Sequence, residues 1–120
     1  MKVFLSLGMS GKSEYEIRKN IDSMKLMSHY IFNNLKDADD IVFIHNADCV
    51  APDNRLRIKN PSLYYLGEAI KKMGDADAVL FWVDYRRHKG CLVEEECARQ
   101  YNIDRYYIEI KEEVKGNADE

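Results

Sequence analysis

The sequence contains few cysteines, no excess of basic charge and no long apolar run. Its three cysteines, Cys49, Cys91 and Cys97, are odd in number and form no C-x-x-C pair, which indicates reduced thiols and a cytoplasmic protein. The net charge of -3 argues against general nucleic-acid binding, because proteins with that function are usually basic. No run approaches the roughly 20 apolar residues of a membrane span, and the N-terminal run is too short for a signal peptide. We therefore expect neither a membrane nor nucleic acid as a partner.

The length and composition predict one globular domain. Hydrophobic residues make up 46% of the 120 residues and charged residues 32%, which is typical of a folded domain. A chain of this size buries roughly two-thirds of its unfolded surface, so it has a core of its own. We place the domain at residues 1–110 and expect the polar stretch "KEEVKGNADE" at 111–120 to form a C-terminal tail.

Apolar runs alternate with segments of helical periodicity. The runs are continuous rather than alternating in polarity, which is typical of parallel strands that are buried on both faces. Ser13 with Glu16 three places later forms a capping-box signal for one helix, and Pro61 opens another. The pattern predicts an α/β fold with a short parallel sheet of four to five strands and helices on both faces. The expected strands are 2–7, 41–45, 78–83 and 106–110, and the expected helices are 13–35, 61–73 and 91–101.

The carboxyl ends of parallel strands meet at one edge of the sheet, where ligands of such folds bind. Three loops should therefore form one crevice, namely 6–12, 46–60 and 84–90. No cluster of histidine, cysteine and aspartate has the spacing of metal ligands, so we expect neither a metal nor a cofactor there.

The stretch "SLGMSGKS" at 6–13 partly matches the phosphate-binding P-loop, G-x-x-x-x-G-K-[ST]. Gly11 and Lys12 fit, Ser6 replaces the first glycine, and Asp84 stands where such enzymes hold magnesium. Alternatively, the glycines only allow a tight turn into the helix, or the small residues let a ligand approach the backbone amides. We favour this last interpretation, a ligand loop of small residues, over a P-loop.

The stretch "DYRRHKGCLVEEECA" at 84–98 carries the most chemistry. Leu92 and Val93 are expected to be buried anchors, which leaves Glu94 facing the crevice, where a carboxylate can attack an electron-poor carbon. Glu95 and Glu96 fit an ordinary acidic helix N-terminus, because the helix dipole favours carboxylates in the first turns. The basic side chains of 86–89 either form an anion site or remain a solvated loop.

Most of the chain resembles the nucleoside 2-deoxyribosyltransferase-like superfamily, in particular its small members grouped as a domain of unknown function. The likeness rests on "KVFLSLGMSG", "DADAVLFWVD" and "GCLVEEECARQYNI", in which Gly90, Glu94 and Ala98 match the family spacing. It implies a flavodoxin-like three-layer sandwich. It also implies a glutamate nucleophile at Glu94 and an active site completed by a neighbouring subunit, hence a homodimer or larger homo-oligomer.

The resemblance implies an N-glycosidic enzyme that acts on a nucleoside or nucleotide. A carboxylate attacks the anomeric carbon, and a second acid, for which Asp84 and Glu68 are candidates, assists the leaving base. Two departures from the family leave a transferase, an N-hydrolase and binding without turnover as alternatives: His88 replaces an acidic residue, and Ala69 replaces an aspartate. The basic loop favours a 5′-monophosphate. The candidate substrate-binding residues are Ser6, Gly8, Met9, Tyr64, Tyr65, Arg86, Arg87, His88 and Gly90.

Overall fold

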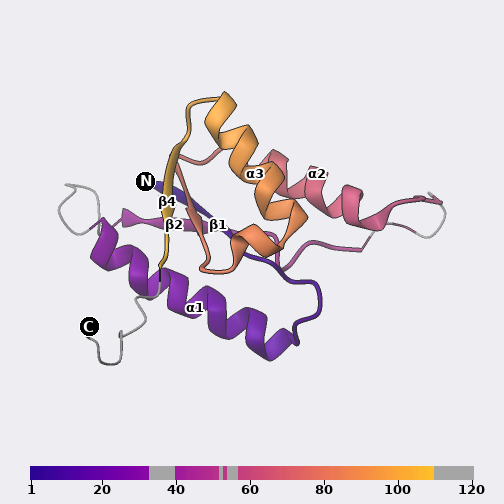
Figure 1. Ribbon diagram of the computed structural model, residues 1–120, viewed down its shortest axis with the longest axis horizontal. Helices are drawn as coiled ribbons and strands as arrows, with labels where there is room; N and C mark the ends of the chain where they lie inside the picture. The colour runs from indigo at the N-terminus through magenta and orange to yellow at the C-terminus, as the bar shows by residue number, and fades with distance from the viewer. Residues whose placement is uncertain (33–39, 52, 54–56, 110–120) are drawn as a thin grey trace, which may run out of the picture.

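Strands and helices alternate along the chain in the computed structural model (Figure 1), as the apolar runs predict. The structure describes residues 1–32, 40–51, 53 and 57–109, so the expected tail at 111–120 lies outside the described residues. No helix within these ranges is long and apolar enough to cross a membrane. In chain order the elements are β1 (Lys2–Ser6), α1 (Glu14–Ile31), β2 (Val42–Ile44), α2 (Pro61–Met73), β3 (Ala78–Phe81), a 3-10 turn (Tyr85–Arg87), α3 (Lys89–Gln100) and β4 (Asp104–Tyr107).

The four strands form one parallel sheet in the order β2-β1-β3-β4, which confirms the predicted α/β class and is compatible with a flavodoxin-like sandwich. Strand β1 pairs with β2 on one side and with β3 on the other, so that Val3 lies opposite both Phe43 and Ala78. The chain leaves β1 for one edge of the sheet and later returns past it to the other edge. The order therefore switches between β1 and β3, the place where ligands of such sheets bind.

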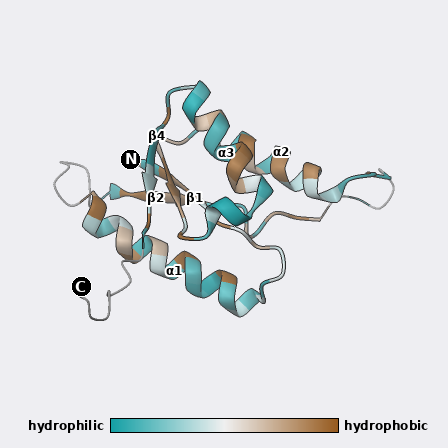
Figure 2. Ribbon diagram, viewed as in Figure 1, coloured by the Kyte–Doolittle hydropathy of each residue, from teal (hydrophilic) through white to brown (hydrophobic). Residues whose placement is uncertain are grey.

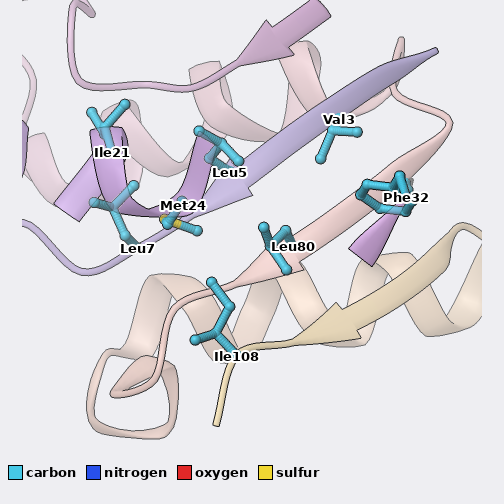
Figure 3. Close-up of a cluster of buried hydrophobic side chains, with 9 residues drawn as sticks. Val3, Leu5, Leu7, Ile21, Met24, Phe32, Leu80 and Ile108 are labelled. Carbon is cyan, nitrogen blue, oxygen red and sulfur yellow. The ribbon is translucent and has the colours of Figure 1, made fainter. Parts of the chain in front are cut away.

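Helices cover both faces of the sheet, with α1 on one face and α2 and α3 on the other (Figure 1). Because side chains alternate along a strand, Leu5 and Leu80 pack toward α1, whereas Phe4 and Phe81 pack toward α2 and α3. Figure 3 shows Ile21 and Met24 of α1 beside Leu5. The ribbon of β1 and β3 is hydrophobic, whereas α1 is hydrophilic along much of its length (Figure 2). This three-layer arrangement places the carboxyl ends of β1 and β3 between the helix layers.

Helix α1 begins where the capping signal predicts. Ser13 is its N-cap, and the Glu16 backbone N–H donates to Ser13 Oγ at 3.1 Å. The buried face includes Ile21, Met24 and Ser28, as the periodicity indicates. The helix ends at Ile31, and the rest of the predicted helix, 33–35, lies outside the described residues.

Two expectations about α3 are wrong. The helix begins at Lys89, because a 3-10 turn directly follows β3 and His88 already serves as the N-cap. Leu92 and Val93 are 42% and 40% exposed, so neither is a buried anchor. The buried face instead consists of Cys91, Glu94 and Ala98, which follow one another at helical spacing. The run 94–96 consequently lies beyond the first turn, where the helix dipole has little effect.

All four strands differ from their predicted ranges: β1 ends one residue early, β2 is one residue shorter at each end, and β3 and β4 differ most. Strand β4 spans Asp104–Tyr107 rather than 106–110, because the chain turns at Asn102, with a φ of 58°, and enters the sheet at once. Its register against β3 aligns Ala78 with Asp104. Strand β3 ends at Phe81, two residues before the predicted end, so the loop that leads to α3 begins earlier.

Candidate functional site

A cleft of about 710 Å³ opens at the carboxyl ends of β1 and β3, within the size range of small-molecule sites. The three loops that were expected to meet all contribute to it, and α2 forms a further wall. The lining residues are Gly8, Met9 and Ser10 after β1, Asn46, Ala47 and Cys49 after β2, Ser62, Tyr65, Leu66 and Ala69 of α2, and Arg87, His88, Lys89, Gly90, Cys91 and Glu94 around the start of α3.

Glu94 is a buried carboxyl group in this cleft, with only 7% of the residue exposed. Ser6 Oγ donates a hydrogen bond of 2.6 Å to Glu94 Oε1. Burial raises the pKa of Glu94 to about 7, because a carboxylate loses hydration there, and the Ser6 hydrogen bond opposes this rise. The hydrogen bond occupies one oxygen of the carboxyl group and leaves Oε2 without a hydrogen-bond partner among the described residues.

The position of Ser6 follows from the sheet. Ser6 is the last residue of β1, lies opposite Phe81 of β3, and accepts a hydrogen bond from the Trp82 backbone N–H at 2.9 Å. Its side chain also meets Cys91, one turn before Glu94 on α3. Burial raises the pKa of the Cys91 thiol to about 12, so this cysteine is a poor nucleophile. The central strand and α3 therefore hold the Glu94 carboxyl group in place.

A second polar cluster joins the loop after β1 to the loop after β3. Lys12 Nζ donates to Asp84 Oδ2 at 2.6 Å, and His88 Nε2 lies 3.3 Å from the same oxygen. Burial opposes ionisation of Asp84, but its hydrogen bonds with Lys12 and His88 outweigh this and lower the pKa of the carboxyl group. Asp84 is therefore an ionised acceptor, and its Oδ1 is buried without a partner in the described part of the chain.

Gly8 allows His88 to approach the backbone of the loop after β1. A Cβ atom on Gly8 would lie 2.1 Å from two carbon atoms of the His88 ring, well inside van der Waals contact. Any larger residue would displace the ring. This glycine of the loop thus serves to pack a histidine against the backbone.

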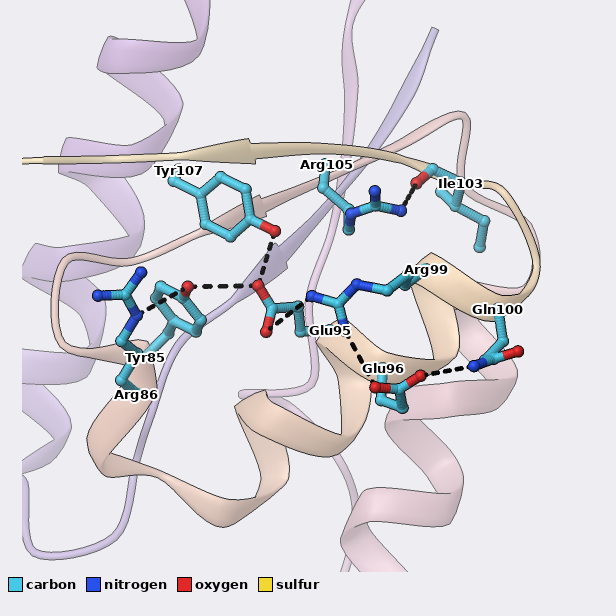
Figure 4. A network of polar contacts seen from close by, with 9 residues as sticks. All are labelled: Tyr85, Arg86, Glu95, Glu96, Arg99, Gln100, Ile103, Arg105 and Tyr107. Atoms are coloured by element: carbon cyan, nitrogen blue, oxygen red, sulfur yellow. Dashed lines mark hydrogen bonds and ion pairs between the residues drawn. The ribbon is translucent and has the colours of Figure 1, made fainter.

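Of the four basic side chains at residues 86–89, three line the cleft, namely Arg87, His88 and Lys89. Arg86 lies instead beside a separate hollow of about 450 Å³, where its Nε donates to the Tyr85 hydroxyl at 3.1 Å. Figure 4 shows the network of this side, in which the hydroxyls of Tyr85 and Tyr107 donate to Glu95. Glu94 and Glu95 therefore line two different hollows beside α3, and the basic residues at 86–89 are divided between these hollows.

The structure brings most of the predicted site residues together. Seven of them line the cleft, and Ser6 and Asp84 contact this lining through Glu94 and His88; the seven are Gly8, Met9, Tyr65, Arg87, His88, Gly90 and Glu94. Besides Ser6 and Asp84, three further predicted residues do not line the cleft, namely Tyr64, Glu68 and Arg86.

Glu68 misses the cleft because it is one place off the position that faces it. Ala69 lines the cleft, whereas Glu68 does not, and its Oε2 lies 3.4 Å from Lys71 Nζ. One residue corresponds to about 100° of rotation around a helix, so the two side chains diverge. Tyr64 and Tyr65 diverge in the same way, and only Tyr65 reaches the cleft.

Sequence reasoning missed several cleft residues. Cys91 lies three places before Glu94, so helical spacing alone could have placed both on one face. Asn46 and Cys49 carry no such signal, because a long polar loop does not reveal which of its residues turn inward. Among the residues described, no group of three or more histidine, cysteine, aspartate or glutamate side chains is arranged to hold a metal ion.

Comparisons with models of protein families, with curated proteins and with solved structures found no match.

Proposed function

We propose that the protein cleaves the N-glycosidic bond of a nucleoside or nucleoside 5′-monophosphate, with Glu94 as the nucleophile. The observation that carries the proposal is the Glu94 carboxyl group, buried in the cleft and fixed by Ser6 through one oxygen. With a pKa of about 7, a large fraction of this carboxyl group is ionised at neutral pH. The likeness of residues 90–98 to the nucleoside 2-deoxyribosyltransferase-like superfamily gives the same role to the same residue.

The reaction would proceed in two displacements. Glu94 Oε2 attacks C1′ of the sugar while the bond from C1′ to the base nitrogen breaks, and the base leaves with that electron pair and gains a proton. The sugar is then bound to Glu94 as an ester. Attack by water on C1′ gives hydrolysis, and attack by the nitrogen of a second base gives transfer. The open cleft admits either acceptor, so both outcomes belong to the proposal.

The basic residues at the cleft favour a substrate with a 5′-phosphate. Arg87 and Lys89 line the cleft, and neither forms an ion pair with another residue that the structure describes. The first turn of α3 contains no acidic residue, and the N-cap His88 makes no side-chain capping hydrogen bond. This side of the cleft is therefore electropositive, as an anion site requires. Lys12 is excluded from this role, because Asp84 already compensates its charge.

Binding without turnover is the second candidate. The observation that favours it is the position of Glu68, because this expected acid does not line the cleft and lies 3.4 Å from Lys71 Nζ. A P-loop-like phosphate enzyme is less well supported. Such an enzyme uses its lysine on the phosphates, whereas Lys12 Nζ lies 2.6 Å from Asp84 Oδ2.

We extend the proposal to the assembly and location of the protein. Leu63 and Val50 are exposed, and each is adjacent in sequence to a cleft-lining residue, Ser62 or Cys49. A second copy that covers these side chains would make a homodimer or larger oligomer with a completed cleft, and sedimentation equilibrium tests this. The three free cysteines support a cytoplasmic location.

The test is chromatographic detection of base released from a panel of nucleosides and 5′-monophosphates, with and without a free acceptor base. The variant is Glu94→Gln, and the matched control is Glu96→Gln, an exposed glutamate on the same helix. We expect Glu94→Gln to lose activity by more than about 100-fold and Glu96→Gln to keep it. Tight binding with no release, unchanged in Glu94→Gln, would favour the binding module instead.

A further inference from the structure

We infer that His88 is the catalytic acid that gives a proton to the leaving base, and that Asp84 and Lys12 are positioning residues for it. The inference rests on the proposed function. It assigns a role that the sequence analysis offered to Asp84 and Glu68, and the geometry favours neither of these. Glu68 does not line the cleft, and the carboxyl group of Asp84 is committed to Lys12 and His88.

His88 is the residue of this cluster that reaches the cleft. It lines the same cleft as Glu94, whereas neither Asp84 nor Lys12 does. Its side chain is largely buried, with 18% exposed, and its Nε2 lies 3.3 Å from Asp84 Oδ2. The other ring nitrogen, Nδ1, has no hydrogen-bond partner among the described residues. The ring therefore has one nitrogen held by the protein and one available to a ligand.

The position of the ring is fixed from two sides. Its face lies against Gly8, where a Cβ atom would come within 2.2 Å of Nδ1 and 2.1 Å of two ring carbons. On the other side, Asp84 Oδ2 contacts Nε2 of the ring and is itself fixed by Lys12 Nζ at 2.6 Å. A histidine whose Nε2–H is bound to an ionised carboxylate is fixed in its orientation and in its tautomer. Lys12 keeps Asp84 ionised, so the carboxylate orients the ring without taking its proton.

The proton balance follows from these contacts. As the Glu94 Oε2–C1′ bond forms and the bond from C1′ to the base breaks, a proton passes from His88 Nδ1 to a ring nitrogen or carbonyl oxygen of the base. The base leaves neutral and His88 becomes neutral. In the second step water attacks C1′, the bond from C1′ to Glu94 breaks, and the water proton returns to His88 Nδ1. All charges and protons are then restored.

A test that separates this role from others varies the leaving group. A purine methylated at N7 already carries a positive charge and leaves without a proton from the enzyme. The variant His88→Gln places an amide nitrogen near the position of Nε2, so it keeps a donor for Asp84 but cannot transfer a proton. Base release is measured for methylated and unmethylated purine nucleosides, each with and without a 5′-phosphate.

We expect His88→Gln to slow base release from unmethylated purines by about 10²–10⁴-fold and to have little effect on methylated ones, with or without phosphate. An equal loss for both leaving groups would overturn the inference and make His88 a structural residue. A loss confined to the monophosphates would also overturn it, and would make His88 a phosphate ligand. If the wild-type protein releases no base from any substrate, the proposed glycosidic function is wrong, and the role inferred for His88 is then wrong as well.

The positioning role of Asp84 has a spectroscopic readout that does not depend on turnover. Nitrogen-15 chemical shifts report which ring nitrogen carries the proton in neutral histidine. We expect the proton on Nε2 in the wild-type protein, and a loss of that preference in Asp84→Asn. A preference for Nδ1 in the wild-type protein, or no change in Asp84→Asn, would contradict the arrangement.

Discussion

Ser6 and Glu94 are 88 residues apart in the sequence, yet Ser6 Oγ donates to Glu94 Oε1 at 2.6 Å. The contact joins the end of the central strand β1 to the middle of α3. Both residues are buried, so the hydrogen bond forms where water does not compete with it. It satisfies one oxygen of a carboxyl group that burial would otherwise penalise in its ionised form.

The burial of Glu94 predicts that the protein loses stability as the pH rises. The pKa of Glu94 is about 7 in the folded protein and near its ordinary value of 4.5 when unfolded, so the folded state binds this proton more tightly. The stabilisation is fully present below pH 4.5 and is lost as the pH rises through 7, by up to about 3 kcal/mol. Urea unfolding between pH 5 and 8 measures this. The decline should be absent in Glu94→Gln, and parallel curves for the two proteins would contradict the prediction.

Removing the Ser6 hydroxyl should lower the free energy of unfolding by an amount that depends on pH. Ser6→Ala leaves Glu94 Oε1 without its donor, which raises the pKa of Glu94 further and penalises the ionised form. We expect a loss of about 1–3 kcal/mol in the free energy of unfolding at pH 8 and a smaller loss at pH 5. Ser10→Ala, at an exposed position of the same cleft, is the control and should change stability by less than about 0.5 kcal/mol. Equal losses at both pH values for Ser6→Ala would show that the hydroxyl does not act on the charged carboxyl group.

The sequence predicted the layers of the fold well because its apolar runs are continuous. Runs such as 78–81 are fully buried, and only a strand between two helix layers buries every residue of so short a run. The start of α1 was equally clear, since the Ser13 hydroxyl caps a backbone amide of its own helix. Local signals of this kind need no knowledge of the tertiary structure.

The parts that sequence reasoning missed depend on contacts between distant residues. The buried face of α3 combines Cys91, Ala98 and a carboxyl group, whereas the apolar Leu92 and Val93 are exposed. Hydrophobicity alone does not reveal this face, because it contains a carboxyl group and two small residues. Lys12 and Asp84 were each singled out, but their 2.6 Å contact spans 72 residues and requires the strand order to be known.

The close approach of Gly8 to His88 predicts that a single methyl group is costly there. In Gly8→Ala the added Cβ would lie 2.1 Å from the ring, so the ring or the loop must move. We expect a loss of about 1–3 kcal/mol in the free energy of unfolding, together with shifted NMR signals of His88. Gly67→Ala is the matched control, because Gly67 lies inside α2 with nothing within 4 Å of an added Cβ. That variant should gain up to about 1 kcal/mol from helix propensity. Unchanged stability and unchanged His88 signals in Gly8→Ala would contradict the packing described.

The three cysteines predict a labelling pattern that reports on the cleft. Cys91 is 3% exposed and burial raises the pKa of its thiol to about 12, so only about 1 in 10,000 of these thiols is ionised at pH 8. Cys49 and Cys97 are half-buried and accessible. Iodoacetamide at pH 8, followed by peptide mass spectrometry, should modify these two in the folded protein and Cys91 only after unfolding.

The same labelling tests occupancy of the cleft, because Cys49 lines it and Cys97 does not. We expect a saturating nucleoside 5′-monophosphate to slow the modification of Cys49 several-fold and to leave the rate at Cys97 unchanged. Cys97 is the internal control, since it reports any general change in stability or reagent. Equal protection of both cysteines would indicate a global effect of the nucleotide. Protection of neither would place the nucleotide outside the cleft, and the role proposed for Glu94 would then lose its substrate.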